Sequence, residues 1–233
     1  MNRTLTSWPA SSLLGRLQPA VRAGLLELGV EREFPRNHTM VEHGGHHDRT
    51  LLLLRGAAKI VVSSEDGRVV LLGMVSGGDL AGEMTAIDPQ ESSANVVTCV
   101  RTTARVIESR ALKDFLRRQP EAHFAVTRMI IERLREANRR RVDYGLAALC
   151  KLARVMVELI GKFGVDVDGR YEIVGCLTQA ELGSLAGMAT RTVEEQLGEL
   201  QKRDIIELSY RKIVVNDLER LRKVAKLPAV IPR

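Results

Sequence analysis

The sequence predicts an α+β protein with an N-terminal β-roll (jelly roll), a long dimerisation helix and a C-terminal winged helix-turn-helix. Three observations lead to this fold class. Short β-branched runs separated by glycine fill residues 32–108, a helical pattern covers residues 121–144, and residues 177–215 combine two helix signals with two short strands. The domains expected from these patterns are residues 12–119, 120–145 and 146–226.

The N-terminal part begins with apolar residues at helical spacing between Leu13 and Leu28, which predicts helical structure there. In the roll, the clearest hairpin signal joins the apolar run at 59–62 to the run at 69–72 through the turn Glu65-Asp66-Gly67. Glycines at Arg55-Gly56 and within residues 76–79 interrupt further apolar strands. Short strands at this spacing are typical of a small barrel or roll.

The helix expected from Glu121 to about Tyr144 carries a heptad-like seam that is half apolar and half polar. The seam consists of Phe124, Thr127, Ile131, Leu134, Asn138 and Arg141. We interpret it as the pairing surface of a homodimer, and packing within one domain is the alternative.

The C-terminal part is expected to begin with a core helix from Leu146 to Phe163 that ends at Gly164. Thr178 and Glu181 then form a capping box, which predicts the start of a helix that ends near Gly187. Gly183, Gly187 and Val193 supply the small contact residue, the turn glycine and the apolar anchor that a helix-turn-helix needs. The second helix is expected over residues 190–202, and the strands 205–208 and 213–215 would flank a wing tip at 209–212.

Charge and composition favour a folded protein with a polyanionic partner. The chain has 233 residues, 45% hydrophobic residues and a formal net charge of +6. It contains no apolar run of the roughly 20 residues that span a bilayer and no signal-peptide pattern, so we expect a cytoplasmic protein with no membrane partner. Cys99, Cys150 and Cys176 form no paired motif and are expected to be reduced core residues.

Two short runs accompany the order of roll, long helix and winged helix-turn-helix: Gly82-Glu83-Met84 and Leu177 to Leu182. With these runs the chain resembles the cyclic-AMP receptor protein/FNR (Crp/Fnr) family of bacterial transcription regulators. The resemblance covers about residues 12–225. It implies a cyclic-nucleotide-binding-like β-roll, a homodimer and double-stranded DNA as partner, with RNA polymerase as a further candidate partner. Residues 76–84 look like the family's nucleotide cassette.

The cassette differs from the family pattern at the residue that binds the phosphate of the nucleotide. Gly82 and Glu83 match, but the family's phosphate-binding arginine falls on Ser92, followed by Ser93, and its adenine-reading pair falls on Ala137 and Asn138. Replacing a charge-assisted contact by a neutral hydrogen bond costs about 1–3 kcal/mol. We therefore expect no tight cyclic AMP binding, and either another ligand or a vestigial pocket in which Gly82 is a turn residue and Glu83 a structural acceptor.

The positions of the cysteines and histidines bear on two other sensor chemistries, an iron–sulfur cluster and a metal or haem site. The family's oxygen-sensing branch uses an N-terminal cysteine cluster, which nothing before Cys99 supplies, so an iron–sulfur cluster is not expected. Four histidines, His38, His43, His46 and His47, raise a metal or haem hypothesis. Their spacing matches no standard site, and we expect a solvated loop and no metal.

The reading helix also departs from the family. A typical Ser-Arg-Glu-Thr-Val opening is replaced by residues 189–193, Ala-Thr-Arg-Thr-Val, so Thr190 is expected to cap the helix and Arg191 to contact guanine. A family arginine one turn later is replaced by Glu195, and Gln196 is expected to pack rather than read. The candidate DNA-contacting residues are Thr178, Thr190, Arg191, Thr192, Glu195, Arg211 and Lys212.

These residues predict a sequence-specific, homodimeric transcription regulator that does not depend tightly on cyclic AMP. One alternative is a protein-binding module whose second helix, made acidic by Glu194, Glu195 and Glu199, docks on a partner. Another is a cyclic-nucleotide-responsive regulator. We expect no enzyme, because the sequence has no nucleophile–base pair, P-loop, zinc-protease motif or dinucleotide fingerprint.

Overall fold

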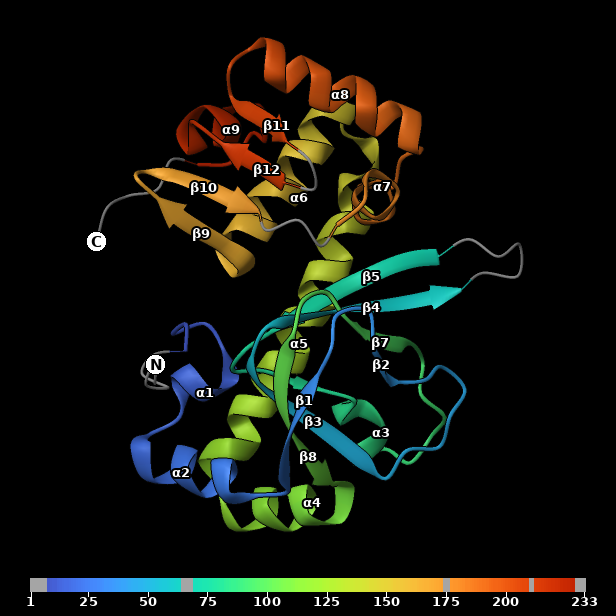
Figure 1. The fold of residues 1–233 in the computed structure, drawn as a ribbon, viewed down its shortest axis with the longest axis vertical. Coiled ribbons are helices and arrows are strands. Elements are labelled where there is room, and N and C mark those ends of the chain that lie inside the picture. Colours follow the sequence, from blue (N-terminus) through green and yellow to red (C-terminus); the bar gives the residue numbers. More distant parts are fainter. Residues whose placement is uncertain (1–7, 64–68, 174–176, 210–211, 229–233) are drawn as a thin grey trace. The chain divides into compact units, whose positions relative to one another are not determined.

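The computed structural model describes residues 8–63, 69–173, 177–209 and 212–228, and the chain divides into two compact units (Figure 1). One unit comprises residues 1–68 and 72–136, and the other comprises residues 69–71 and 137–233. The roll, the long helix and the C-terminal helix-turn-helix are all present, which confirms the predicted fold class.

The β-roll consists of two antiparallel four-stranded sheets, with strand orders β1-β8-β3-β6 and β2-β7-β4-β5. Its strands are β1 (Val30–Phe34), β2 (Thr39–Val41), β3 (Arg49–Arg55), β4 (Ala57–Ser63), β5 (Val69–Ser76), β6 (Leu80–Ala81), β7 (Asn95–Thr98) and β8 (Thr102–Glu108). Leu51, Leu53 and Ala104 of one sheet pack with Ala58 and Val96 of the other, so the core lies between the inner faces. The predicted hairpin is formed by β4 and β5, and its turn at 65–67 lies outside the described residues.

Helices cover the opposite face of the β1-β8-β3-β6 sheet. They are α1 (Leu13–Arg16), α2 (Pro19–Glu27), α3 (Glu83–Ile87), α4 (Ser109–Arg118) and α5 (Pro120–Val142). A second core joins Leu52 and Ile107 of the sheet to Leu14, Leu112 and Val126 of the helices.

The helical structure expected between Leu13 and Leu28 is present, but it is divided into two helices. Leu17 and Gln18 have extended backbone angles between α1 and α2, and Pro19 begins α2. Proline lacks an amide donor and fits the first turn of a helix better than its interior. Pro19 therefore starts a new helix instead of continuing the first one.

The long helix α5 has one buried and one exposed face. Ala122, Ala125, Val126 and Met129 are buried against the roll. The six seam residues Phe124, Thr127, Ile131, Leu134, Asn138 and Arg141 are all exposed. Phe124 is 76% exposed, although a side chain of this size is normally kept from water. The seam, including its apolar residues Phe124, Ile131 and Leu134, is thus uncovered on this single chain.

The second unit is a four-stranded antiparallel sheet, β11-β12-β10-β9, packed with helices. Its elements are the short 3₁₀ turn η1 (Asp143–Gly145), α6 (Ala148–Phe163), β9 (Gly164–Val167), β10 (Arg170–Ile173), α7 (Gln179–Ala186), α8 (Thr190–Lys202), β11 (Ile206–Ser209), β12 (Lys212–Val215) and α9 (Leu218–Val224). As predicted, α6 ends at Gly164 and supplies core residues such as Leu152 and Met156.

Two further predictions concern thiols and membranes. Cys99 and Cys150 are buried free thiols, as expected, and Cys176 lies outside the described residues. Within the part of the chain that the structure describes, no helix combines the length and apolar character needed to cross a membrane.

Candidate functional site

The start of α7 is fixed by the predicted capping box. The Thr178 hydroxyl accepts a hydrogen bond from the Glu181 amide at 3.2 Å, and the Glu181 carboxylate accepts one from the Thr178 amide at 2.7 Å. Both partners satisfy backbone donors that a helix start otherwise leaves unpaired. At the other end, Gly187 adopts a left-handed φ of 61° and terminates α7, as predicted.

Close packing of α7 on α8 depends on Gly183. A Cβ atom at this position would lie 2.6 Å from the Met188 carbonyl oxygen and 3.4 Å from a Val193 methyl group. Val193 itself is fully buried. The roles predicted for Gly183, Gly187 and Val193 are therefore confirmed by the contacts that surround them.

The beginning of α8 differs from the expectation. Ala189 is the N-cap residue, with φ and ψ of −66° and 151°, and no side chain caps the helix. The prediction that Thr190 is the cap is wrong, because Thr190 already lies in the first turn. Leu197, rather than Gln196, is the buried anchor one turn after Val193, and Gln196 is half-buried.

The exposed face of α8 carries the predicted reading residues. The Arg191 side chain is 89% exposed, and its guanidinium lies 3.3 Å from the Glu195 carboxylate. Thr190 is exposed and Thr192 is half-buried. An exposed ion pair one helical turn apart contributes only about 0.3–0.5 kcal/mol, so Arg191 can exchange this partner for another acceptor.

The acidic character of α8 is reduced by pairing within the helix segment. Glu195 is paired with Arg191, and Glu199 lies 2.8 Å from Arg203. Glu194 is exposed. The face that sequence reasoning treated as acidic is therefore a mixed surface on which cations and carboxylates alternate.

At the wing, β11 and β12 form the predicted strands. The Lys212 ammonium is half-exposed and forms an ion pair with Glu172 of β10. Tyr210 and Arg211 lie outside the described residues. Sequence reasoning missed Glu172, because β10 was not predicted and no local pattern links it to β12.

The cassette residues Gly82 and Glu83 begin α3. Gly82 has a left-handed φ of 75° and is the N-cap of this short helix. The Glu83 side chain is 4% exposed, and its carboxylate is 2.5 Å from the Arg133 guanidinium of α5. Arg133 also donates to the Leu80 carbonyl at 2.6 Å. The cassette carboxylate thus has a charged partner 50 residues further along the chain.

Arg133 was missed at the sequence level, although a signal for it exists. It follows the buried Met129 by four residues and so lies on the inward face of α5. A cation at an inward register needs a partner, because an unpaired buried charge is strongly unfavourable.

The remaining candidate ligand-binding residues have separate environments. Ser92 is buried and donates to the Ala94 carbonyl at 2.9 Å, whereas Ser93 is exposed. Asn138 is an exposed residue of the second unit.

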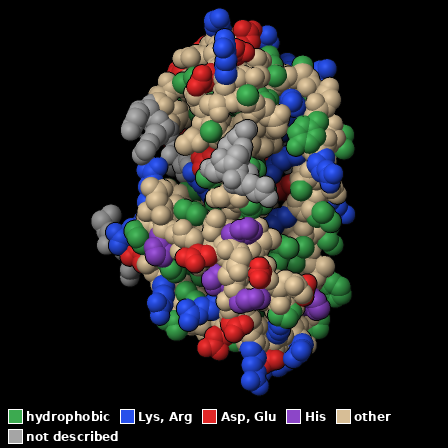
Figure 2. Space-filling model, turned by 90° about the vertical axis from the view of Figure 1, so that its right-hand side faces the viewer, with side chains coloured by type: hydrophobic (Ala, Val, Ile, Leu, Met, Phe, Trp, Pro, Cys, Tyr) green, Lys and Arg blue, Asp and Glu red, His purple; other side chains and the backbone are tan. Residues whose placement is uncertain are grey.

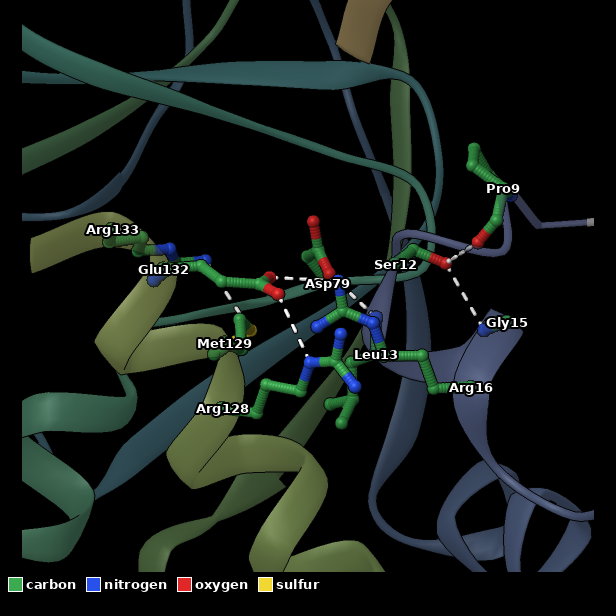
Figure 3. Close-up of polar contacts among 10 residues, drawn as sticks. All are labelled: Pro9, Ser12, Leu13, Gly15, Arg16, Asp79, Arg128, Met129, Glu132 and Arg133. Atoms are coloured by element: carbon green, nitrogen blue, oxygen red, sulfur yellow. Dashed lines mark hydrogen bonds and ion pairs between the residues drawn. The ribbon is translucent and has the colours of Figure 1, made fainter. Parts of the chain in front are cut away.

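The N-terminal segment is bound to the same part of α5 and to Asp79 of the cassette. Figure 3 shows Arg16 of α1 and Arg128 of α5 both directed at Glu132, at 2.8 and 3.2 Å. Burial raises the pKa of Glu132, but the hydrogen bonds from Arg16 and Arg128 outweigh it, so this pKa lies below its ordinary value. The Leu13 amide donates to the Asp79 carboxylate at 2.8 Å.

Three of the four histidine side chains contact different partners. The His38 ring lies against Phe34 with centroids 5.4 Å apart, His47 interacts with the Glu42 backbone, and His46 is 3.8 Å from the Glu91 carboxylate. The described residues include no group of three or more possible metal ligands. Figure 2 shows histidine side chains on one face of the roll, interspersed with cations and carboxylates.

Two family models match the chain. One, described as a cyclic nucleotide-binding domain, matches residues 31–119, and the other, described as a Crp-like helix-turn-helix domain, matches residues 150–224. Together they span most of the sequence. The first includes the whole cassette, and the second includes both α7 and α8.

Curated relatives and solved structures agree with these matches. The "CRP-like cAMP-activated global transcriptional regulator" of Mycobacterium tuberculosis is 28% identical over 211 residues, which cover 90% of this chain and 94% of that protein. The "cAMP-activated global transcriptional regulator Vfr" of Pseudomonas aeruginosa is 22% identical over 191 residues, covering 79% and 88%. The structure of FixK2 from Bradyrhizobium japonicum has a TM-score of 0.73 at 17% identity, covering 88% of this chain and 100% of that chain. At this identity the structural likeness shows the fold alone.

Proposed function

The chain belongs to the Crp/Fnr family of bacterial transcription regulators, and from this membership we propose how its residues recognise DNA and how far it depends on a nucleotide. It is a DNA-binding regulator of the Crp/Fnr type. The proposal adds that it acts in the cytoplasm as a homodimer on double-stranded DNA, without catalytic activity of its own.

The exposed reading face of α8 carries the proposal. A helix of this size fits the major groove, which is about 12 Å wide, and the N-terminal residues of a recognition helix meet the base edges. Arg191 is assigned a guanine contact, and Thr190 and Thr192 are assigned phosphate or thymine-methyl contacts. Glu195 either accepts from cytosine or positions Arg191, to which it is already paired.

Phosphate contacts are assigned to the flanks of α8. Thr178 lies at the N-terminus of α7, where backbone amides favour an anion. Arg211 and Lys212 belong to the wing segment, and Lys212 would exchange Glu172 for a phosphate oxygen. These contacts position the protein without reading the sequence.

The dimer is assigned to the exposed seam of α5. A stripe that includes Phe124, Ile131 and Leu134 gains stability when it is covered, and a second copy of the helix presents a matching stripe. Two-fold pairing would supply two copies of α8 for two half-sites of an operator. RNA polymerase is proposed as the further partner that a transcription regulator of this kind contacts.

We also propose that cyclic AMP is bound weakly and is not needed for DNA binding. The support comes from the phosphate position, where Ser92 is buried and uses its hydroxyl within the loop. Arg133 cannot easily replace the missing arginine, because its guanidinium is engaged by Glu83 and Leu80. The domain type and the names of the relatives make cyclic nucleotide the natural ligand to test against this expectation.

Selection from random double-stranded DNA tests the reading assignment. The wild-type protein should enrich one palindromic motif without nucleotide. Arg191→Ala should lose about 1–3 kcal/mol on that motif and relax one base position, whereas Lys212→Ala should weaken motif and random DNA alike. Equal losses on both DNAs for Arg191→Ala would remove its reading role.

A salt titration separates DNA binding from the protein-docking alternative. Neutralising phosphates releases counterions, so the affinity for DNA should fall steeply with salt. No enrichment with or without cyclic AMP, together with a shallow salt dependence, would favour a protein partner. The pairing of Glu195 and Glu199 with arginines weakens that alternative, because it leaves α8 less acidic than its sequence indicates.

A further inference from the structure

A cavity of 490 Å³ lies within the β-roll at the end formed by the loop between β2 and β3. Its apolar wall is formed by Phe34, Met40, Val41, Leu51 and Val106. Val41 and Leu51 belong to the core between the two sheets, and the other three pack against that core. The volume is in the range of pockets that hold small molecules.

The rest of the lining is charged and polar. Arg32 and Arg49 contribute two guanidinium groups, His46 and His47 contribute imidazoles, and Asp48 contributes one carboxylate. No ion pair of Arg32 or Arg49 is found among the residues that the structure describes. The lining therefore carries a net positive charge beside an apolar wall, and its cations are available to an anion.

Both arginines occupy inward registers of the sheet. Arg32 lies opposite the core residue Ala104 in the β1–β8 ladder, and Arg49 precedes Leu51 by two residues on β3. Side chains two residues apart on a strand share a face. An inward charge on the edge strand β1 can be explained as protection against edge pairing. Arg49 is the exposed first residue of β3, and there the strand pairs with β8 alone, because β6 pairs only with Leu51 and Leu52.

The histidine loop is folded toward the cavity. The His47 imidazole lies within 3.3 Å of both the amide nitrogen and the carbonyl oxygen of Glu42. A Cβ atom at Gly45 would collide with the same ring, so the glycine makes room for it. The loop thus holds an imidazole at the cavity wall.

The cavity adjoins the nucleotide cassette but does not use its residues. Gly82 lies next to Val41 and the Arg49 carbonyl oxygen, each 3.5 Å from the position of a Cβ atom. Glu83, Ser92 and Ser93 do not line the cavity. Glu108 lies opposite Arg49 in the β3–β8 ladder and is also absent from the lining.

We propose that this cavity binds a small organic anion with an apolar body. The apolar body packs against Leu51, Met40 and Val106, and the anionic group is held by Arg49, with Arg32 and the imidazoles as further donors. A guanidinium–carboxylate contact is charge-assisted and often bidentate, which gives the site its preference for an acid. The inference does not rest on DNA binding, because the site is complete within the roll.

Calorimetric titration of the full-length protein tests the site with matched probes. Hexanoate and 3-phenylpropionate are compared with their neutral counterparts 1-hexanol and 3-phenylpropanol. The acids should bind saturably and at least about tenfold more tightly than the alcohols, because only the acids use the guanidinium. Arg49→Ala should weaken the acids about tenfold, and Arg55→Ala, the same change at the opposite, equally exposed end of β3 and outside the cavity, should leave them within about twofold.

A second variant fills the cavity. Val106→Phe adds volume at the apolar wall and should weaken acids and alcohols together. If a variant unfolds at the temperature of the titration, NMR of the wild-type protein is used instead. The methyl chemical shifts of Val41, Leu51 and Val106 should then change when the same probes are added. The proposal would be overturned by the absence of saturable binding up to about 10 mM or by equal affinity for acid and alcohol. It would also be overturned by equal effects of Arg49→Ala and Arg55→Ala or by unchanged methyl chemical shifts. None of these readouts involves DNA, so failure here is distinct from failure of the regulator proposal.

Discussion

The helix-turn-helix and the nucleotide cassette differ in the sequence distance of the contacts that shape them. Thr178 caps α7 by accepting from the amide of a residue three positions away, and Gly183 makes room for residues five and ten positions away. In the roll, Glu83 is partnered by Arg133 across 50 residues, and Leu13 is bonded to Asp79 across 66 residues. The first region is determined by local signals, and the second by tertiary partners.

The two regions also differ in how their candidate residues meet solvent. Arg191 and Glu195 are mostly exposed and joined by a weak pair, so a ligand of α8 can replace this pair at little cost in free energy. Glu83 and Ser92 are buried and already hydrogen-bonded or ion-paired. A ligand that needs them must first compete with contacts that stabilise the fold.

The largest expected effect comes from breaking the long-range pair of the cassette. Arg133→Ala leaves the Glu83 carboxylate buried and unpaired, which should lower the free energy of unfolding by about 3–5 kcal/mol. Urea denaturation measures this loss. Arg128→Ala, which removes an exposed arginine from the same helix, should cost about 1 kcal/mol or less. Equal losses for the two variants would mean that Arg133 is not held as the structure shows.

A smaller effect is expected at the local contact between α7 and α8. Gly183→Ala places a Cβ atom 2.6 Å from the Met188 carbonyl oxygen and should destabilise the protein by about 1–3 kcal/mol. Gly198→Ala on α8 meets nothing within 4 Å and should stabilise the helix by about 0.5–1 kcal/mol. Thermal unfolding of the pair is the measurement. A stabilising Gly183→Ala would show that the two helices are less closely packed than described.

The capping box should contribute about as much to the free energy of unfolding as N-caps do in other proteins. Thr178→Ala removes the acceptor for the Glu181 amide and should cost about 1 kcal/mol. Thr178→Ser keeps the hydroxyl and should cost less. Hydrogen exchange of the first amides of α7 locates the effect, and unchanged protection in Thr178→Ala would contradict the assigned cap.

The smallest expected effect is the titration of Glu132, whose lowered pKa reflects its bonds to Arg16 and Arg128. Because the folded-state pKa is depressed, the contribution of Glu132 to stability is present above the unfolded-state pKa and is lost as the pH falls through the folded-state value. Arg16→Ala should move the pKa of Glu132 upward in a carboxyl NMR titration. Arg135→Ala, the loss of another arginine from α5, should leave it in place, and equal shifts would rule out a specific bond.

The sequence predicted most of the fold, including the two helices α7 and α8 that carry the proposed reading residues. Capping, glycine turns and apolar periodicity are read over a few residues, so α7 and α8 could be located from Thr178, Gly187 and Val193. The wing strands could be located from the alternating apolar residues at 205–208 and 213–215. One local signal was misread, because Ala189 rather than Thr190 begins α8. Pro19 divides the first helical segment in two.

The partners of the functional residues could not be predicted in the same way. Nothing near Glu83 in the sequence indicates Arg133, and nothing near Lys212 indicates Glu172, because each pair forms only when distant elements pack. The cavity beside Arg49 has the same origin, since its wall comes from four strands and a loop. Periodicity places such residues on an inward face but does not identify what they meet.

Capture of fragmented genomic DNA by the purified protein, without nucleotide and then with cyclic AMP, tests the central claim most directly. The account predicts enrichment of one palindromic motif without nucleotide and little change when cyclic AMP is added. Enrichment only with cyclic AMP would contradict the claim that the cassette no longer controls DNA binding through this nucleotide.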